Sequence, residues 1–250
     1  MLNRLLNSAV SRTMLMAVVA TVAITGTDAR ASSMTVPTER PGLGGRSAAA
    51  MTTDTRANAG SSCLAKLAAF TDAKRVRSPR GRFRACRVKG AVQLSTVETP
   101  TGPVTLSGKP VLACTFALSL AQWTRDVAAP AARRTVRKRL TALRTGPGFT
   151  CRRRNNSRRG KLSEHGLGNA VDITGFRFDA TGKRGGFDVK RRLPRRFKRF
   201  QKLVRAEACG PFTTILGPGS NRHHSDHLHF DHGRLFRNGK RRAKPPLVCR

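Results

Sequence analysis

A largely apolar stretch lies near the middle of the chain: Val111 to Trp123, which reads VLACTFALSLAQW and follows Pro110. Proline is tolerated in the first turn of a helix, because its missing N–H would have no helical partner there. In a helix built from this stretch, apolar side chains would fall on nearly every side. We therefore predict a central helix over Val111 to Trp123 that is buried on most of its surface.

Shorter elements are predicted on both sides of this stretch. In chain order, the apolar pattern predicts a helix that begins near Cys63, a basic loop over Lys74 to Arg87, strands at Val88 to Leu94, Val104 to Leu106, Ala170 to Ile173, Thr213 to Leu216 and Leu228 to Asp231, and an amphipathic helix over Phe197 to Ala208. The segment Ala131 to Arg144 fits a helix and a hairpin strand equally well. Because helices and strands mix without a βαβ rhythm, we expect an α+β fold with a small antiparallel sheet and flanking helices.

The charge of the chain is extreme for a protein that can fold. Its 250 residues contain 49 Lys and Arg against 13 Asp and Glu, which gives a net charge of +36. With 38% hydrophobic residues the chain can bury a core, which excludes a wholly disordered basic protein. Such a charge indicates an anionic partner, and by itself it fits nucleic acid, lipid headgroups or an acidic wall polymer.

The N-terminal 31 residues have the features of a secretory signal. A basic beginning is followed by an uncharged apolar run from Met14 to Ile24 and by Ala29-Arg30-Ala31, an A-x-A cleavage site. This run is too short to span a membrane. We predict a signal peptide over residues 1–31, a flexible basic tether over 32–60 and a folded domain over 61–250. The protein is then exported to the periplasm or the cell wall.

Export favours disulfide bonds among the cysteines. The mature part contains six cysteines: Cys63, Cys86, Cys114, Cys151, Cys209 and Cys249. No two of them form the close pair that is typical of a structural zinc ribbon, whereas disulfides are common in oxidising compartments. Of the many possible pairings we favour the sequential one, in which each cysteine bonds to its neighbour in the sequence (63 with 86, 114 with 151, 209 with 249).

The histidines gather near the C-terminus. All six follow Glu164, and five lie between His223 and His232. Ser163 to Asp172 (SEHGLGNAVD) offers His165 and Asp172, seven positions apart. His227 and His229 lie two apart in a predicted strand and therefore point to the same face. With one of these two imidazoles, the chain could supply two histidines and one carboxylate, a set that suits a catalytic zinc with one open position.

Each of these segments also has a simpler interpretation. A His-rich run is typical of an incidental metal-binding tract or of solvated surface, and a His-x6-Asp spacing often arises by chance. Asp172 could also serve to bond backbone groups or an arginine. The two segments together, with an apolar strand residue between His227 and His229, favour the metal site.

Several ordered motifs over residues 63 to 250 resemble the bacterial extensin-like protein C-terminal domain family. They are Gly148 to Arg152 (GFTCR), Arg154 to Asn156, Leu162 to Phe176, Ala208 to Phe212, Leu216 to Gly219, Asp226 to Asp231 and the terminal Cys249-Arg250. The His-x6-Asp and His-x-His motifs are also similar to those of the zinc D,D-peptidase superfamily, which cleaves peptidoglycan peptides. This second resemblance implies a Hedgehog/D,D-peptidase-like fold, stabilised here by disulfides.

The resemblance also implies roles for individual residues. His165, Asp172 and His229 would bind Zn²⁺. Asp226 matches the acidic position that acts as general base in part of the peptidase superfamily, and His227 would stabilise the developing oxyanion, with His224 a weaker candidate for the acid/base role. Arg152 matches an arginine that contacts substrate near the metal.

These expectations lead to two functions. The first is a secreted zinc-dependent hydrolase acting on peptidoglycan peptides, and the alternative is a non-catalytic cationic protein that binds or builds the cell wall. In either case the expected partner is peptidoglycan or another anionic envelope polymer. Nucleic acid is disfavoured, because few aromatic residues accompany the basic runs and binding of single strands usually combines the two.

Overall fold

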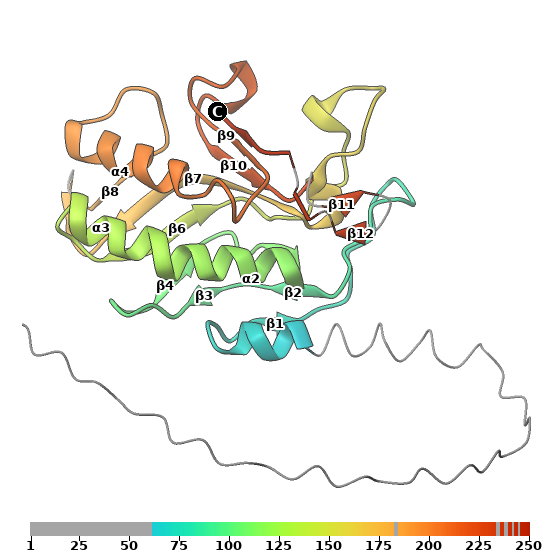
Figure 1. Ribbon diagram of the computed structural model, residues 1–250, viewed down its shortest axis with the longest axis horizontal. Helices are drawn as coiled ribbons and strands as arrows, with labels where there is room; N and C mark the ends of the chain where they lie inside the picture. Colours follow the sequence, from blue (N-terminus) through green and yellow to red (C-terminus); the bar gives the residue numbers. More distant parts are fainter. Residues whose placement is uncertain (1–61, 183–184, 234–235, 238–239, 242, 245) are drawn as a thin grey trace, which may run out of the picture. The chain divides into compact units, whose positions relative to one another are not determined.

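The fold is described from a computed structural model (Figure 1). The structure describes residues 62–182, 185–233, 236–237, 240–241, 243–244 and 246–250. The predicted signal peptide (1–31) and tether (32–60) lie outside these residues and stay predictions, as does the start of the domain at residue 61. Among the described helices, none combines the length and the apolar character that crossing a membrane requires.

An eight-stranded mixed sheet is the largest element of the fold. Its strand order is β13-β9-β10-β7-β6-β4-β3, and β8 pairs with β7 beside this path. The strands are β3 (Thr96–Val97), β4 (Val104–Leu106), β6 (Leu140–Thr145), β7 (Ala170–Phe178), β8 (Gly186–Asp188), β9 (Thr214–Leu216), β10 (Leu228–Asp231) and β13 (Val248–Cys249). The α+β class is confirmed, but the sheet is larger than predicted and not purely antiparallel. The pairs β4/β6 and β9/β13 are parallel; the chain passes through a long helix between β4 and β6, as parallel pairing requires.

The predicted central helix is confirmed only in part. Helix α2 covers Cys114–Trp123, whereas Val111–Ala113 forms strand β5. β5 pairs with β2 (Ala91–Gln93), which also pairs with β1 (Lys74–Arg75), in a second, three-stranded sheet. The prediction was wrong for Val111–Ala113 because backbone pairing with β2 outweighs the helix-start preference of Pro110.

Helix α2 continues through a π-helical turn, η1 (Thr124–Ala128), into α3 (Ala129–Thr135). Pro130 lies in the first turn of α3 and cannot donate to a carbonyl one turn back, which explains a widened turn before it. The segment that fitted both helix and strand contains both, since β6 begins at Leu140. The remaining helices are residues 62–68 and α4 (Arg195–Ala206), and β11 (Phe236–Arg237) pairs with β12 (Lys240–Arg241).

Helices α2 and α3, which η1 joins into one long helix, and helix α4 cover one face of the sheet. In Figure 1, α2 and α3 run across the strands and α4 lies beside α3. The Trp123 ring packs edge-on against Phe230 of β10 at 5.1 Å between ring centroids, and its Nε1 donates to the Val204 carbonyl of α4. We call this side the helix face. Side chains of β7 and β10 that point away from it lie on what we call the site face.

A register shift redirects β7 partway along its length. Thr145 and Arg144 of β6 pair with Ile173 and Gly175, so Thr174 has no partner in this ladder. An extra residue of this kind reverses which face the following side chains point to. Phe176 therefore joins the helix face, where it packs against Phe200 of α4 at 5.0 Å.

All six cysteines form disulfides, but two of the three predicted pairings were wrong. The bonds are Cys63–Cys114, Cys86–Cys151 and Cys209–Cys249. Only the last agrees with the sequential pairing. Pairing of β5 with β2 places Cys114 at the start of α2, next to helix 62–68, and this leaves Cys86 to bond with Cys151.

Candidate metal centre

Two of the predicted metal ligands face each other across neighbouring strands. In the antiparallel pair β7/β10, Asp172 is directly opposite His229. Residues opposite each other in such a ladder point to the same face. On the site face, His229 Nδ1 lies 2.8 Å from Asp172 Oδ1. Strand register therefore brings together two side chains that are 57 positions apart in the sequence.

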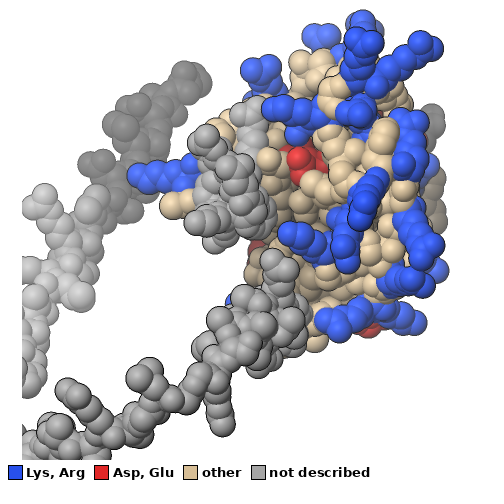
Figure 2. Space-filling view, turned by 90° about the vertical axis from the view of Figure 1, so that its right-hand side faces the viewer, with Lys and Arg blue, Asp and Glu red and all other residues tan. Residues whose placement is uncertain are grey.

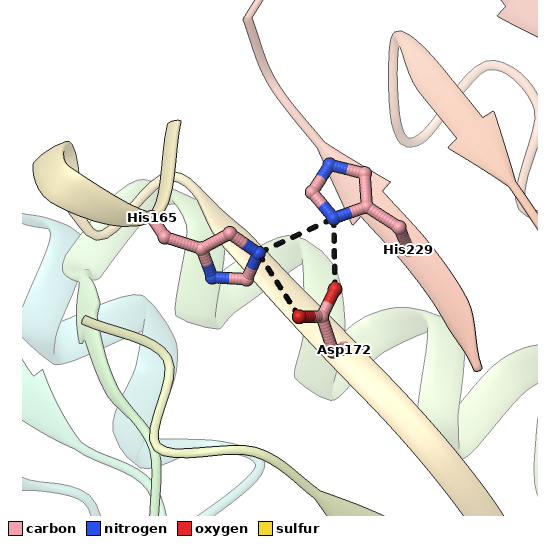
Figure 3. Close-up of side chains that lie close together, drawn as sticks. All are labelled: His165, Asp172 and His229. Carbon is pink, nitrogen blue, oxygen red and sulfur yellow. Dashed lines mark hydrogen bonds and ion pairs between the residues drawn. The ribbon is translucent and has the colours of Figure 1, made fainter. Parts of the chain in front are cut away.

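The third predicted ligand comes from a short 3₁₀ helix that precedes β7. His165 lies in η3 (Glu164–Leu167) and is buried. Its Nε2 is 3.3 Å from Asp172 Oδ2 and 3.3 Å from His229 Nδ1. Figure 3 shows the three side chains pointing toward one another from η3, β7 and β10. One ligand atom from each lies within 4.8 Å of the others, so the group could hold a metal ion.

Both histidine rings are fixed by a second partner on the outer side. Gly148 O accepts a hydrogen bond from His165 Nδ1 at 2.8 Å, and Asp231 Oδ2 accepts one from His229 Nε2 at 3.0 Å. With the outer nitrogen of each ring engaged in this way, the inner nitrogen is the one that faces Asp172 and could bind a metal once it is deprotonated. Such outer partners are typical of histidines that bind metals.

The backbone at Gly148 also depends on having no side chain. It has φ +76, and a Cβ there would lie 2.7 Å from the Val111 carbonyl oxygen. Only glycine therefore lets the chain bring this carbonyl to His165.

The donor set and its spacing fit a tetrahedral zinc ion. Zinc binds imidazole nitrogen at about 2.0–2.1 Å, which separates two ligand atoms of a tetrahedron by about 3.3–3.4 Å. The two inner nitrogens, His165 Nε2 and His229 Nδ1, are 3.3 Å apart, and they lie 3.3 Å from Oδ2 and 2.8 Å from Oδ1 of Asp172, respectively. Two histidines and one carboxylate leave the fourth position for water or substrate, as in catalytic zinc sites.

His227 and Asp226 border this group. His227 Nε2 is 3.6 Å from Asp172 Oδ1, so its ring faces the ligands from the side. Its other nitrogen, Nδ1, is 2.8 Å from Asp226 Oδ1, and the Asp226 side chain is 83% exposed. Asp226 thus lies on the solvent side of His227.

Comparison with known families assigns the chain. The family described as Extensin-like protein C-terminus matches residues 61–242. The chain belongs to this extensin-like family. The matched range contains the three candidate ligands and all cysteines except Cys249. No curated protein and no solved structure matches the chain.

The electrostatics of the extensin-like domain favour an ionised carboxylate at the centre of the group. Burial acts to raise the pKa of Asp172, but hydrogen bonds from His165 and His229 outweigh it and hold the pKa well below its usual range. For His229, burial acts to lower the pKa, whereas its hydrogen bonds to Asp172 and Asp231 raise it to about 9. Asp172 therefore carries the negative charge that a divalent cation requires.

Arg152 and His224 lie next to the site without joining the ligand group. The Arg152 carbonyl accepts a hydrogen bond from Ser163 N, which places this residue beside η3, and its guanidinium forms no ion pair with a described carboxylate. His224 Nδ1 is 2.7 Å from Asn221 Oδ1, and its ring centroid is 5.5 Å from that of His229. Burial, followed by the nearby His229 and His227, lowers the pKa of His224 to about 4. His224 is therefore neutral near pH 7.

Two functional groups were missed as parts of the site. Asp231 follows His229 by two residues in β10, so strand alternation could have placed it on the same face. The Gly148 carbonyl had no signal in the sequence beyond the Gly-Pro-Gly turn. Both groups accept a hydrogen bond from the outer nitrogen of a histidine ring. The spacing of the metal ligands in the sequence does not predict such partners.

Proposed function

We propose that the protein is an exported zinc-dependent hydrolase that cleaves peptide bonds in peptidoglycan. The observation that carries this proposal is the convergence of His165, Asp172 and His229 with spacing and outer partners suited to zinc. The likeness of the two histidine motifs to those of D,D-peptidases supports the substrate class. The extensin-like family by itself assigns no reaction.

The metal would take its place among three side chains whose positions are fixed by the fold. A zinc ion bound there would lower the pKa of a bound water and polarise the carbonyl to be attacked. Gly148 O and Asp231 hold the two imidazoles with their inner nitrogens toward Asp172, so metal binding would need the release of a proton from His229 but little movement of the rings.

Asp226 and His227 would handle protons and charge beside the ligands. Because Asp226 hydrogen-bonds to His227 Nδ1, we expect the two to act as a pair. Asp226, as the predicted general base, would receive the proton of the attacking water, directly or through His227. The paired imidazole would stabilise the oxyanion, and whichever member of the pair holds the proton would return it to the leaving amine.

Substrate binding would rely on positive charge. Arg152 lies beside η3 with no acidic partner among the described residues and could pair with a carboxylate of a peptidoglycan peptide. Without the predicted signal peptide, which carries three arginines and one aspartate, the net charge falls from +36 to +34 (36 minus 2) and would hold the exported protein near an anionic envelope polymer.

The alternative function is cationic wall binding without catalysis. One feature of α4 favours it. Its apolar side packs into the core through Phe197 and Phe200, while the residues along its other side and just before it are exposed and basic: Arg191, Arg192, Arg195, Arg196, Lys198, Arg199 and Lys202. Basic residues in the first turn oppose the helix dipole, a cost that an anionic ligand would offset.

Digestion of purified muropeptides separates the two functions. The zinc-loaded wild type should release shorter peptides, detected by mass spectrometry, and His165→Ala should release none. Asp226→Asn should bind zinc normally and cleave about 10²–10⁴-fold more slowly. Asp126→Asn is the matched control, since it changes an exposed aspartate on η1, and should cleave like the wild type. Full zinc loading without cleavage of any muropeptide would leave only the binding function.

A further inference from the structure

A loop rich in arginine leads from β1 to β2. We call residues 77–87 the arginine loop. It contains five exposed arginines and no acidic residue: Arg77, Arg80, Arg82, Arg84 and Arg87. None of the five forms an ion pair with a carboxylate of the described residues. Unpaired like charges in so short a segment repel one another and favour an expanded loop.

The loop is nevertheless held in a compact form. The Cys86–Cys151 disulfide anchors its C-terminal end, and Ser78 Oγ accepts a hydrogen bond from Val88 N at 2.9 Å. Gly81 packs directly on the disulfide, since a Cβ there would lie 2.3 Å from that of Cys151. The arginines are therefore brought together by covalent and steric constraints.

The constrained loop borders an open surface pocket of about 480 Å³. Its charged lining consists of four guanidinium side chains, from Arg77, Arg80, Arg84 and Arg87. Phe83 also lines it, and the guanidinium groups of Arg82 and Arg153 lie over that ring at 4.5 and 5.0 Å. Figure 2 shows a face of the molecule with many Lys and Arg side chains and only small acidic patches.

We propose that the arginine loop is a binding site for phosphodiester groups of a sugar-phosphate or glycerol-phosphate polymer. The loop uses only arginine, whose planar fork binds phosphate through two parallel hydrogen bonds, whereas lysine acts as a point charge. Four arginines line one pocket, which suits phosphate, a tetrahedral anion that repeats along such a polymer. This site is distinct from the metal centre, and its test does not depend on catalysis.

Two other sources of phosphate fit less well. Among the large apolar residues of the described part only Leu247 is exposed, so the loop has no apolar side chain to insert into a lipid surface. Nucleic acid binding to single strands uses free aromatic faces, and the Phe83 ring already has two guanidinium groups over it.

The arginine loop is packed against the segment that carries one predicted metal ligand. A Cβ on Gly166, the residue after His165, would lie 3.0 Å from Cys86 Sγ. The disulfide that anchors the arginine loop is thus packed against η3. A chain bound in the pocket would thus lie against the part of the fold that positions η3.

Binding of synthetic poly(glycerol phosphate) to the purified protein tests the proposal by calorimetry at physiological salt. The triple variant Arg80→Lys, Arg84→Lys and Arg87→Lys keeps every charge and should still bind about tenfold more weakly, because it loses the two-pronged contacts. The matched control Arg133→Lys, Arg134→Lys and Arg137→Lys makes the same chemical change at three exposed arginines of and just after α3, and it should change the dissociation constant about twofold or less. Thermal unfolding verifies that each variant is folded.

Either of two results would overturn the site. Unchanged binding by the lysine variant of the loop, or an equal loss in the α3 control, would mean that the loop arginines form no specific site. Two further ligands test the alternative sources of phosphate. Single-stranded DNA of matched charge represents nucleic acid, and vesicles of equimolar phosphatidylcholine and phosphatidylglycerol represent a lipid surface. Tighter binding of either one, with the same dependence on the three arginines, would contradict a glycerol- or sugar-phosphate ligand.

Discussion

The two faces of strands β7 and β10 differ in what holds their side chains. On the helix face, Val171, Ile173, Leu228 and Phe230 are fully buried among apolar groups. On the site face, Asp172, His229 and Asp231 are bonded to one another in a row. A buried polar group is tolerated when it has a partner, and here each partner is another member of the site. We infer that the helix face determines stability and the site face determines metal binding.

The largest effect should come from the helix face. Phe230→Ala removes a ring that packs against Trp123 and Phe212, and it should lower the free energy of unfolding by about 3–5 kcal/mol. Chemical denaturation measures this loss. Leu247→Ala, at an exposed apolar side chain, should cost no more than about 0.5 kcal/mol. Equal losses in the two variants would mean that β10 is not packed as described.

On the site face we expect a smaller effect, and it concerns zinc affinity rather than stability. Asp231→Asn weakens the hydrogen bond that orients His229 and should lower zinc affinity about 10–100-fold. Competition with a chromophoric chelator measures it. The control Val171→Ala, on the opposite face of β7, should reduce stability and leave zinc affinity unchanged. If zinc affinity falls in the control rather than in Asp231→Asn, the division between the faces is wrong.

The smallest effect concerns Asp188, an exposed carboxylate of β8 that lies opposite Gly175 of β7. Hydrogen bonding to Arg177, with a further contribution from Arg144, lowers the pKa of Asp188 below its ordinary value of 3.8 despite slight burial. A lowered folded-state pKa stabilises the protein above the unfolded pKa, and this gain is lost as pH falls through the folded value. Because the side chain is 62% exposed, we expect less than about 1 kcal/mol.

Comparing unfolding of the wild type and Asp188→Asn across pH checks this expectation. The wild type should be slightly more stable near pH 6, and the difference should begin to shrink below about pH 4 and vanish once the folded-state carboxylate is protonated at lower pH. A difference that persists at low pH would mean that the charge of Asp188 is not responsible.

The sequence was most informative where one residue pattern had one physical meaning. Alternation placed β10 at the predicted bounds, Leu228 to Asp231, and the two histidine motifs named all three members of the metal-ligand group. The class of fold also followed from the order of elements. These features depend on local periodicity and on the chemistry of single side chains.

Features that depend on distant pairing were less predictable. Val111–Ala113 is a strand because β2 lies beside it, 18 to 22 residues earlier in the chain. The first two disulfides follow from that same pairing, which the cysteine spacing does not encode. Gly148 likewise contributes a carbonyl, and a backbone group leaves no trace in residue identity.

Zinc stoichiometry of the purified wild type and of His165→Ala tests the metal centre most directly. The metal-free wild type, titrated with zinc and desalted, should retain one ion per chain, and His165→Ala should retain none, with both folded by circular dichroism. Retention of one ion by His165→Ala, or of none by the wild type, would contradict a metal centre formed by His165, Asp172 and His229.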